Sequence, residues 1–222
     1  YSCAYFETLH DDLDTAQERK LEYLCRKLRL RRGERLLDIG CGWGGLAVYA
    51  AQRFGVKTVG ITLSEPQAER ANELIREARL ADRCRVEVRD YRELDEPARY
   101  DKLVSVGMFE HVGEQLLPEY FKQAWRLLRP GGVFLNHGIS RSANDPVPHE
   151  TTFSDRYVFP DSELVALHTT QRVAEESGFE VRDVESMREH YAMTLQHWNR
   201  RLLAHRNEAV RTTDETTYRV WR

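Results

Sequence analysis

The sequence LLDIGCGWGG, residues 36–45, decides the fold. Its apolar first half is typical of a buried parallel strand, and its glycines predict a tight turn that enters a helix at residue 46. At such a junction the first backbone N–H groups of the helix lack partners, and the helix dipole makes this end positive. Because glycine has no Cβ, a ligand can approach the backbone closely. The stretch therefore predicts a site for a nucleotide-like cofactor at the C-terminal edge of the strand.

Strands alternate with helices on both sides of this stretch. The pattern predicts strands at residues 34–39, 56–63, 84–89, 102–107, 133–139 and 179–185. It predicts helices at residues 14–30, from 46 onward, and at 65–80, 116–128, 161–177, 190–208 and 214–222, with a long polar loop at 140–160. Ser64 is expected to cap the helix at 65–80, with Gln67 completing a capping box, and Asp161 or Ser162 to cap the helix at 161–177. Such alternation is typical of an α/β protein with a mostly parallel central sheet and helices on both faces.

Composition narrows the class of protein. The chain has 222 residues, of which 41% are hydrophobic and 31% charged, as expected for a folded globular protein. A net charge of -3 gives no electrostatic case for nucleic-acid binding. The four cysteines form no CxxC pair, so we expect free thiols in a reducing cytoplasm and no metal site. We also expect no membrane-spanning helix, because no run of about 18 apolar residues exists.

Two cofactors compete for the glycine-rich turn. Gly40, Gly42 and Gly45 fit the dinucleotide pattern G-x-G-x-x-G, but NAD binding also needs an acidic residue at the tip of the second strand. Residues 60–64 offer none. Asp38 instead lies just before the glycines, where its charge would repel a pyrophosphate. S-adenosylmethionine has no phosphate, and its amino group and sulfonium favour a nearby carboxylate, so it is the predicted cofactor.

The residues after the third strand suit the base of such a cofactor. Asp90, Tyr91 and Arg92 offer an acid for the adenine amine and a flat aromatic side chain. From residue 34 to about 185 the chain thus resembles the Rossmann-like class I methyltransferases. That resemblance implies an antiparallel C-terminal strand beside the fifth strand. We find only helical sequence after residue 185, so we expect this strand, and the region that precedes Tyr1 in the family, to be missing from this chain.

Five separate motifs narrow the resemblance. They are YSCAYF at 1–6, GWG at 42–44, TLSEPQ at 62–67, FEHVG at 109–113 and HYAMTLQHW at 190–198. In this order they resemble the cyclopropane-fatty-acyl-phospholipid synthase and mycolic acid cyclopropane synthase family of SAM-dependent methyltransferases. The resemblance implies methyl transfer to the cis double bond of an unsaturated fatty acyl chain of a phospholipid. It implies a carbocation, loss of a proton to a bound bicarbonate, and closure of a cyclopropane ring.

The resemblance also implies site residues. The catalytic positions would be Cys3, Glu110, His137, Ile139 and Tyr191. The cofactor positions would be Tyr1, Ser2, Asp38, Gly40, Cys41, Gly42, Gly44, Thr62, Leu63, Gln67, Asp90, Tyr91 and Arg92. Aromatic faces stabilise cations, and the candidates are Tyr5, Phe6, Trp43, Phe109, Tyr157 and Phe159. His137 would act through its backbone, and Cys3 is not expected to be a nucleophile because no base is adjacent in sequence.

Alternative functions stay open at this point. One is methyl transfer to another lipid or to a small amine, and another is a non-catalytic SAM-binding homologue. We expect a single domain over 1–222, with a cover and helix at 1–33, a Rossmann-like core at 34–185 and helices over the acceptor site at 186–222. Arginines of the helix at 190–211 would contact anionic headgroups. The expected partner is therefore an unsaturated acyl lipid, and we expect no nucleic-acid partner. We expect a cytoplasmic protein that contacts the inner face of the membrane, and its oligomeric state stays open.

Overall fold

The computed structural model describes residues 2–145, 152–158, 160 and 162–222. The chain divides into two compact units. One, here the sheet unit, comprises Leu21–Asp145 and Glu163–Asp183. The other, here the terminal unit, comprises Tyr1–Lys20, Pro146–Ser162 and Val184–Arg222. Helix α1 (Leu13–Lys27) contributes residues to both units.

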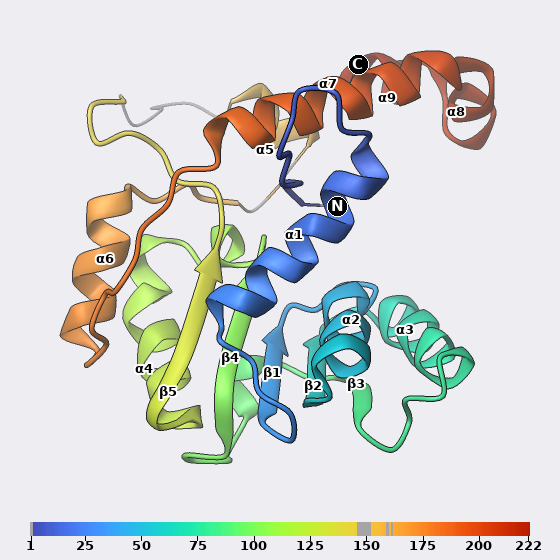
Figure 1. Ribbon diagram of the computed structural model, residues 1–222. Helices are drawn as coiled ribbons and strands as arrows, with labels where there is room; N and C mark the ends of the chain where they lie inside the picture. The colour runs from blue at the N-terminus through green and yellow to red at the C-terminus, as the bar shows by residue number, and fades with distance from the viewer. Residues whose placement is uncertain (1, 146–151, 159, 161) are drawn as a thin grey trace. The chain divides into compact units, whose positions relative to one another are not determined.

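The sheet unit is built around five parallel strands in the order β3-β2-β1-β4-β5 (Figure 1). Their bounds are β1 Arg35–Ile39, β2 Lys57–Thr62, β3 Cys84–Val88, β4 Tyr100–Val106 and β5 Leu128–His137. The first five predicted strands are thus confirmed. The fifth begins earlier than predicted, because Leu128 already pairs with Tyr100 and pairing resumes with Val133 opposite Lys102 after a bulge.

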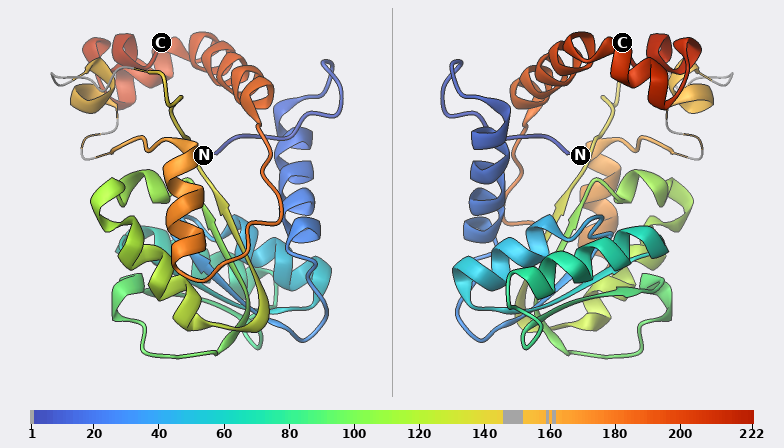
Figure 2. Two further views of the ribbon diagram at one scale, coloured as in Figure 1. Left: turned by 90° about the vertical axis from the view of Figure 1, so that its left-hand side faces the viewer. Right: turned by 90° about the vertical axis from the view of Figure 1, so that its right-hand side faces the viewer.

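Helices cover both faces of this sheet (Figure 2). Leu36 and Val104 pack against α1 and α2, whereas the alternate residues Leu37 and Leu103 point to the other face, against α4. Fully burying such a side chain contributes about 1.5–3 kcal/mol, so the alternation fixes the register of the strands. The remaining helices of the unit are α2 Gly45–Phe54, α3 Glu65–Glu77, α4 Leu117–Leu127 and α6 Leu167–Glu176, with short 3-10 helices η1 Tyr91–Glu93, η2 Phe109–His111 and η3 Glu114–Leu116.

The terminal unit is helical. Besides the start of α1, it contains α5 Phe153–Tyr157, α7 Arg188–Ala204, α8 Arg206–Thr212 and α9 Glu215–Trp221. Its core joins Ala4, Phe6 and Leu13 to Met193 and Trp198 of α7. The two helices predicted after residue 190 are therefore confirmed in type, although the first breaks at His205 into α7 and α8. Among the described residues, no helix combines the length and apolar character that crossing a bilayer requires.

One predicted strand is wrong, and one predicted helix begins later than expected. Residues 179–185 form no strand, because Phe179 and Val181 pack their side chains against α4 and α6 instead of pairing with the sheet. Helix α6 begins at Leu167 and not at 161, since a bridge between Arg141 and Ala166 keeps the preceding chain extended. Its N-cap is Ala166, and of the two predicted caps Asp161 lies outside the described residues. The loop predicted at 140–160 contains α5.

Candidate functional site

The turn after β1 requires glycine at several positions. Gly40, Gly42 and Gly44 have φ values of 76°, 55° and 79°, a left-handed conformation that costs a residue with a side chain about 1–2 kcal/mol. The amides of Gly40 and Cys41 both donate to Ile61 O, at 3.0 and 2.9 Å, which fixes the turn against β2. The predicted strand–turn–helix junction is confirmed.

The glycines differ in what surrounds them. A Cβ at Gly40 would lie 2.7 Å from Met108 Cγ, and one at Gly44 would lie 2.8 Å from Ala71 Cβ. At Gly42 nothing lies within 4 Å. Gly40 and Gly44 are therefore needed for packing, while Gly42 leaves open space in which a ligand can approach the backbone.

Asp38 places a negative charge at the end of β1. Its side chain is buried, and its strand neighbours are Gly60 of β2 and Val104 of β4. Burial, and next the charge of Asp38, raise the pKa of the Cys41 thiol, so Cys41 stays protonated in the turn. The turn thus carries a carboxylate and a neutral thiol, an arrangement that favours a positively charged ligand group.

The end of β2 presents polar side chains. Ser64 caps α3 as predicted, its Oγ accepting from Gln67 N at 3.4 Å. The rest of the predicted capping box is wrong, because Gln67 Oε1 accepts from Thr62 Oγ1 at 2.8 Å and Ser64 N donates to Thr62 Oγ1. With its oxygen bound to Thr62, Gln67 presents its amide nitrogen as a hydrogen-bond donor. Leu63, between them in sequence, is exposed.

The residues after β3 are held by ion pairing and by α4. Asp90 accepts from Arg92 N at 2.9 Å, and the Arg92 guanidinium beside it lowers the pKa of its carboxyl. Gln123 of α4 donates to Tyr91 O at 2.9 Å and to Leu94 O at 2.8 Å. These bonds fix the backbone that carries the half-buried Tyr91 ring. The Arg92 guanidinium already donates hydrogen bonds to the Asp90 carboxylate, which leaves fewer of its lone pairs for a ligand.

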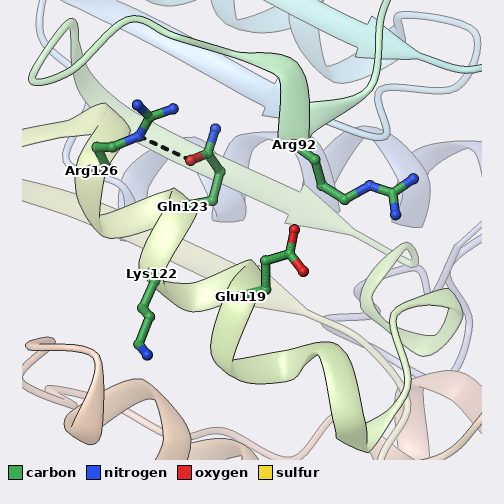
Figure 3. A pocket seen from close by; sticks show the side chains of 5 residues that line it. All are labelled: Arg92, Glu119, Lys122, Gln123 and Arg126. Carbon is green, nitrogen blue, oxygen red and sulfur yellow. Dashed lines mark hydrogen bonds between the residues drawn. The ribbon is translucent and has the colours of Figure 1, made fainter.

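A hollow of about 350 Å³ opens beside Arg92. The residues that line it with Arg92 are all from α4: Glu119, Lys122, Gln123 and Arg126 (Figure 3). Sequence reasoning missed these four, although their spacing places them on one face of a helix. Arg126 donates to Gln123 Oε1 at 3.1 Å. This bond orients the Gln123 amide, whose nitrogen donates to the carbonyl of Tyr91.

Glu110 lies in η2, just after β4, and its side chain is only 8% exposed. Its Oε1 accepts from Ile139 N at 2.8 Å, and its buried Oε2 has no hydrogen-bond partner among the described residues. His137, the last residue of β5, accepts from Gly107 N through its carbonyl at 2.8 Å. The structure thus brings Glu110, His137 and Ile139 to the C-terminal ends of β4 and β5. A buried carboxylate oxygen without a protein partner can accept a hydrogen bond from a bound ligand or water.

Glu163 is a further contact of this region that sequence reasoning missed. Its amide donates to Glu110 O at 2.8 Å, and its Oε2 accepts from Glu114 N at 3.1 Å. A Cβ at Gly113 would lie 2.7 Å from that same oxygen. The segment before α6 therefore fixes the backbone within η2 and at the start of η3.

In the terminal unit, Cys3 lies beside α7, the helix that carries Tyr191. The Cys3 thiol donates to Met187 O at 3.9 Å, and Tyr191 meets Trp198 edge to face at 6.4 Å. Burial raises the pKa of Cys3 to about 11, so the thiol is neutral at physiological pH, in keeping with a backbone role and not a nucleophilic one. Ser2 accepts from Lys20 Nζ at 2.8 Å, and Tyr1 lies outside the described residues.

The aromatic candidates separate into buried and exposed groups. Phe109 is buried in the cluster between α4 and α6, and Phe6 in the core of the terminal unit. Trp43 and Tyr157 are about half exposed, and Phe159 lies outside the described residues. Among the described residues, no cluster of His, Cys, Asp and Glu could hold a metal ion.

These features define a class of protein. A parallel sheet in the order 3-2-1-4-5, a glycine turn after β1 and polar residues at the ends of all five strands are the Rossmann-like fold of the class I methyltransferases. The chain belongs to the mycolic acid cyclopropane synthetase family, whose family model matches residues 1–222.

Two curated relatives illustrate the likeness. The chain is 45% identical over 225 residues to a probable fatty acid methyltransferase of Pseudomonas putida, covering 100% of this chain and 57% of the relative. It is 38% identical over 211 residues to the cyclopropane-fatty-acyl-phospholipid synthase of Escherichia coli K12, covering 92% of this chain and 51% of that protein. The chain therefore spans about half the length of these curated relatives.

Solved structures agree with the fold. The cyclopropane synthase MmaA2 of Mycobacterium tuberculosis is 31% identical with a TM-score of 0.93, over 100% of this chain and 81% of that one. The mycolic acid cyclopropane synthase CmaA1, solved in complex with SAH and CTAB, is 34% identical with a TM-score of 0.91 over the same shares.

Proposed function

We propose that this chain catalyses transfer of a methyl group from S-adenosylmethionine to the cis double bond of an unsaturated acyl chain of a phospholipid, closing a cyclopropane ring. The observation that supports this most is Glu110, a buried carboxylate with one oxygen held by Ile139 N and the other without a partner among the described residues. Family membership and the names of the relatives point to the same class of acceptor.

The sheet unit suits S-adenosylmethionine. Open space at Gly42 admits a ligand to the turn, and the charge of Asp38 attracts the amino group and the sulfonium. Gln67 offers a donor, and Tyr91 offers a flat face for the adenine. The complex of CmaA1 with SAH supports this choice of cofactor. When bound, the cofactor supplies an electrophilic methyl group.

The acceptor is a poor nucleophile, so the protein has to exclude water and stabilise a cation. A buried carboxylate stabilises a positive charge on the acyl chain, and an aromatic face contributes about 2 kcal/mol of further stabilisation when desolvated. Glu110 supplies the carboxylate, and Tyr5, Trp43 and Tyr157 are aromatic candidates that are not fully buried.

A bound bicarbonate fits the proton-accepting role in this proposal. Glu110 Oε2 has only lone pairs to offer, so it can hold a small anion only through that anion's hydroxyl. The hydroxyl of Tyr191 and the backbone of Cys3 and His137 are the other ligand positions that the sequence motifs imply. Ile139 contributes by orienting Glu110, since its amide already donates to Oε1. When bound, the bicarbonate supplies a base.

The C-terminal helices suit contact with anionic lipid. Residues 188–222 carry seven arginines and four acidic residues, a net charge of +3, although the whole chain has -3. Leu195, Leu203 and Trp221 in the same region are exposed. Basic and apolar side chains together favour the surface of an anionic bilayer, so we include peripheral membrane contact in the proposed function.

The experiment is an assay of the full-length protein with S-adenosylmethionine and vesicles of a monounsaturated phosphatidylglycerol. We expect acyl chains heavier by one CH₂ group in the mass spectrum. Glu110→Gln should lower product formation about 10²–10³-fold, while Glu175→Gln, an exposed glutamate of α6, should leave it unchanged. Unchanged acyl chains from a protein that binds S-adenosylhomocysteine in calorimetry would show that the acceptor is wrong. Binding of NAD in its place would show that the cofactor is wrong.

A further inference from the structure

We propose that His190 and Thr194 of α7 are positioning residues that hold residues 2–6, here the N-terminal segment, so that Cys3 and Tyr191 keep a fixed position relative to each other. This inference rests on the proposed function for its catalytic meaning. Its geometric content lies within the terminal unit alone.

Thr194 makes the more buried of the two contacts. Its Oγ1 accepts from Ala4 N at 3.0 Å and donates to His190 O at 2.7 Å. Both Thr194 and Ala4 have an exposed fraction of 0%, so water cannot replace this acceptor. Removing the hydroxyl would leave a buried N–H group without a partner, which is among the costlier changes a folded protein can undergo.

His190 makes the second contact four residues earlier. Its Nδ1 accepts from Phe6 N at 3.1 Å, and its ring stacks on Tyr5 with centroids 4.7 Å apart. The imidazole therefore binds the segment as an unprotonated acceptor at Nδ1. Residues four apart lie on one side of a helix, so both acceptors face the same stretch of chain.

The spacing of the acceptors matches the spacing of the donors. Four residues of helix rise about 6 Å, and two residues of extended chain rise about 6.6 Å. The amides of Ala4 and Phe6 accordingly point to α7, while the amide between them, Tyr5 N, donates to Ala16 O of α1 at 3.0 Å. The segment thus lies between two helices as a strand lies between two neighbours.

Both catalytic candidates of the terminal unit are adjacent to these contacts in sequence. Cys3 directly precedes Ala4, and its thiol reaches the carbonyl of Met187, the N-cap residue of α7. Tyr191 directly follows His190. Holding residues 4 and 6 on α7 therefore sets the Cys3 backbone relative to Tyr191, and neither should move without the other.

The test compares Thr194→Ser, which keeps the hydroxyl, with Thr194→Val, which keeps the shape and removes it. In the full-length enzyme we expect Thr194→Val to lower kcat about tenfold, since it loses a buried hydrogen bond, and to raise the bicarbonate concentration needed for half-maximal rate. Thr194→Ser should stay within about twofold of the wild type, because it keeps that bond. Equal behaviour of the Ser and Val variants would overturn the proposal.

A second readout does not depend on activity. Hydrogen exchange of the peptide that contains residues 2–6 should speed up about tenfold in Thr194→Val, because the Ala4 amide loses its acceptor, and not in Thr194→Ser. Unchanged exchange in the Val variant refutes the positioning role of Thr194 even if no acyl product is found. A rate that does not depend on bicarbonate would count against the proposed base, while the exchange and kcat comparisons would still decide the positioning role.

Should Thr194→Val fail to fold, His190 offers the same test. Asn places its amide oxygen near the position of Nδ1 and can accept from Phe6 N, whereas Gln places it further out. We expect His190→Asn to keep both slow exchange and rate, and His190→Gln to lose both. The reverse order would contradict the proposal.

Discussion

The glycine turn of the sheet unit and the N-terminal segment of the terminal unit are held in opposite ways. In the turn, backbone groups bond to backbone groups of the neighbouring strand β2, as Gly40 N does to Ile61 O. In the segment, backbone amides bond to side chains about 190 residues away, as Ala4 N does to Thr194 Oγ1. The turn is therefore sensitive to strain at single glycines, and the segment is sensitive to the loss of a distant acceptor.

The largest expected effect concerns Glu110. Like the N-terminal segment, its side chain is held by a group distant in sequence, the amide of Ile139. In Glu110→Gln the side-chain oxygen still accepts from Ile139 N, so the fold should persist while the charge at Oε2 is lost. We expect kcat to fall about 10²–10³-fold, as when one preorganised electrostatic group is removed. Affinity for S-adenosylhomocysteine in calorimetry should stay within about twofold, because the cofactor residues are untouched. A variant with more than a tenth of the wild-type rate would contradict this role.

The next effect tests the turn. Gly44→Ala has to place a Cβ at φ 79° and 2.8 Å from Ala71 Cβ, whereas the neighbouring Gly45 has nothing within 4 Å and begins α2. We expect Gly44→Ala to lower the free energy of unfolding by about 2 kcal/mol from strain and crowding. Gly45→Ala, the matched control, should change it by less than about 1 kcal/mol and in the stabilising direction. Urea unfolding measures both, and equal destabilisation would show that conformation does not decide this turn.

The smallest effect appears in alkaline solution and compares thiols of the two units. Burial raises the pKa of Cys3 to about 11, and of Cys25 and Cys84 to about 12, from an ordinary value of 9.0. Between pH 8 and pH 9 the unfolded chain begins to release thiol protons that the native protein keeps, so the free energy of unfolding should fall by about 1 kcal/mol over this interval. Cys3→Ala should flatten part of this fall. A free energy of unfolding independent of pH over this range would refute the buried neutral thiols.

The two regions were not equally predictable. The run of apolar residues before the glycines and the Ser64 cap are local patterns, and they correctly predicted β1 and the start of α3. Residues 179–185 misled because Phe179 and Val181 alternate as in a strand yet pack against helices. An alternating pattern identifies a buried face and not the partner that covers it.

The contacts of the N-terminal segment left no such pattern. Thr194 and His190 occur in a motif that is similar to one of the family. Nothing nearby in sequence shows that they accept hydrogen bonds from the amides of residues 4 and 6. The same holds for Gln123 beneath Tyr91 and for Glu163 beside Glu110. Each is a side-chain or backbone contact between distant segments, which only the folded chain brings together.

The most direct measurement of the proposed reaction uses S-adenosylmethionine with a fully deuterated methyl group. The full-length protein would be incubated with monounsaturated phospholipid vesicles, and the acyl products analysed by mass spectrometry. Ring closure removes one hydrogen from the incoming methyl group, so we expect products that keep two of the three deuterium atoms. Products that keep all three would show methylation without a ring, and acyl chains without deuterium would contradict the proposed function.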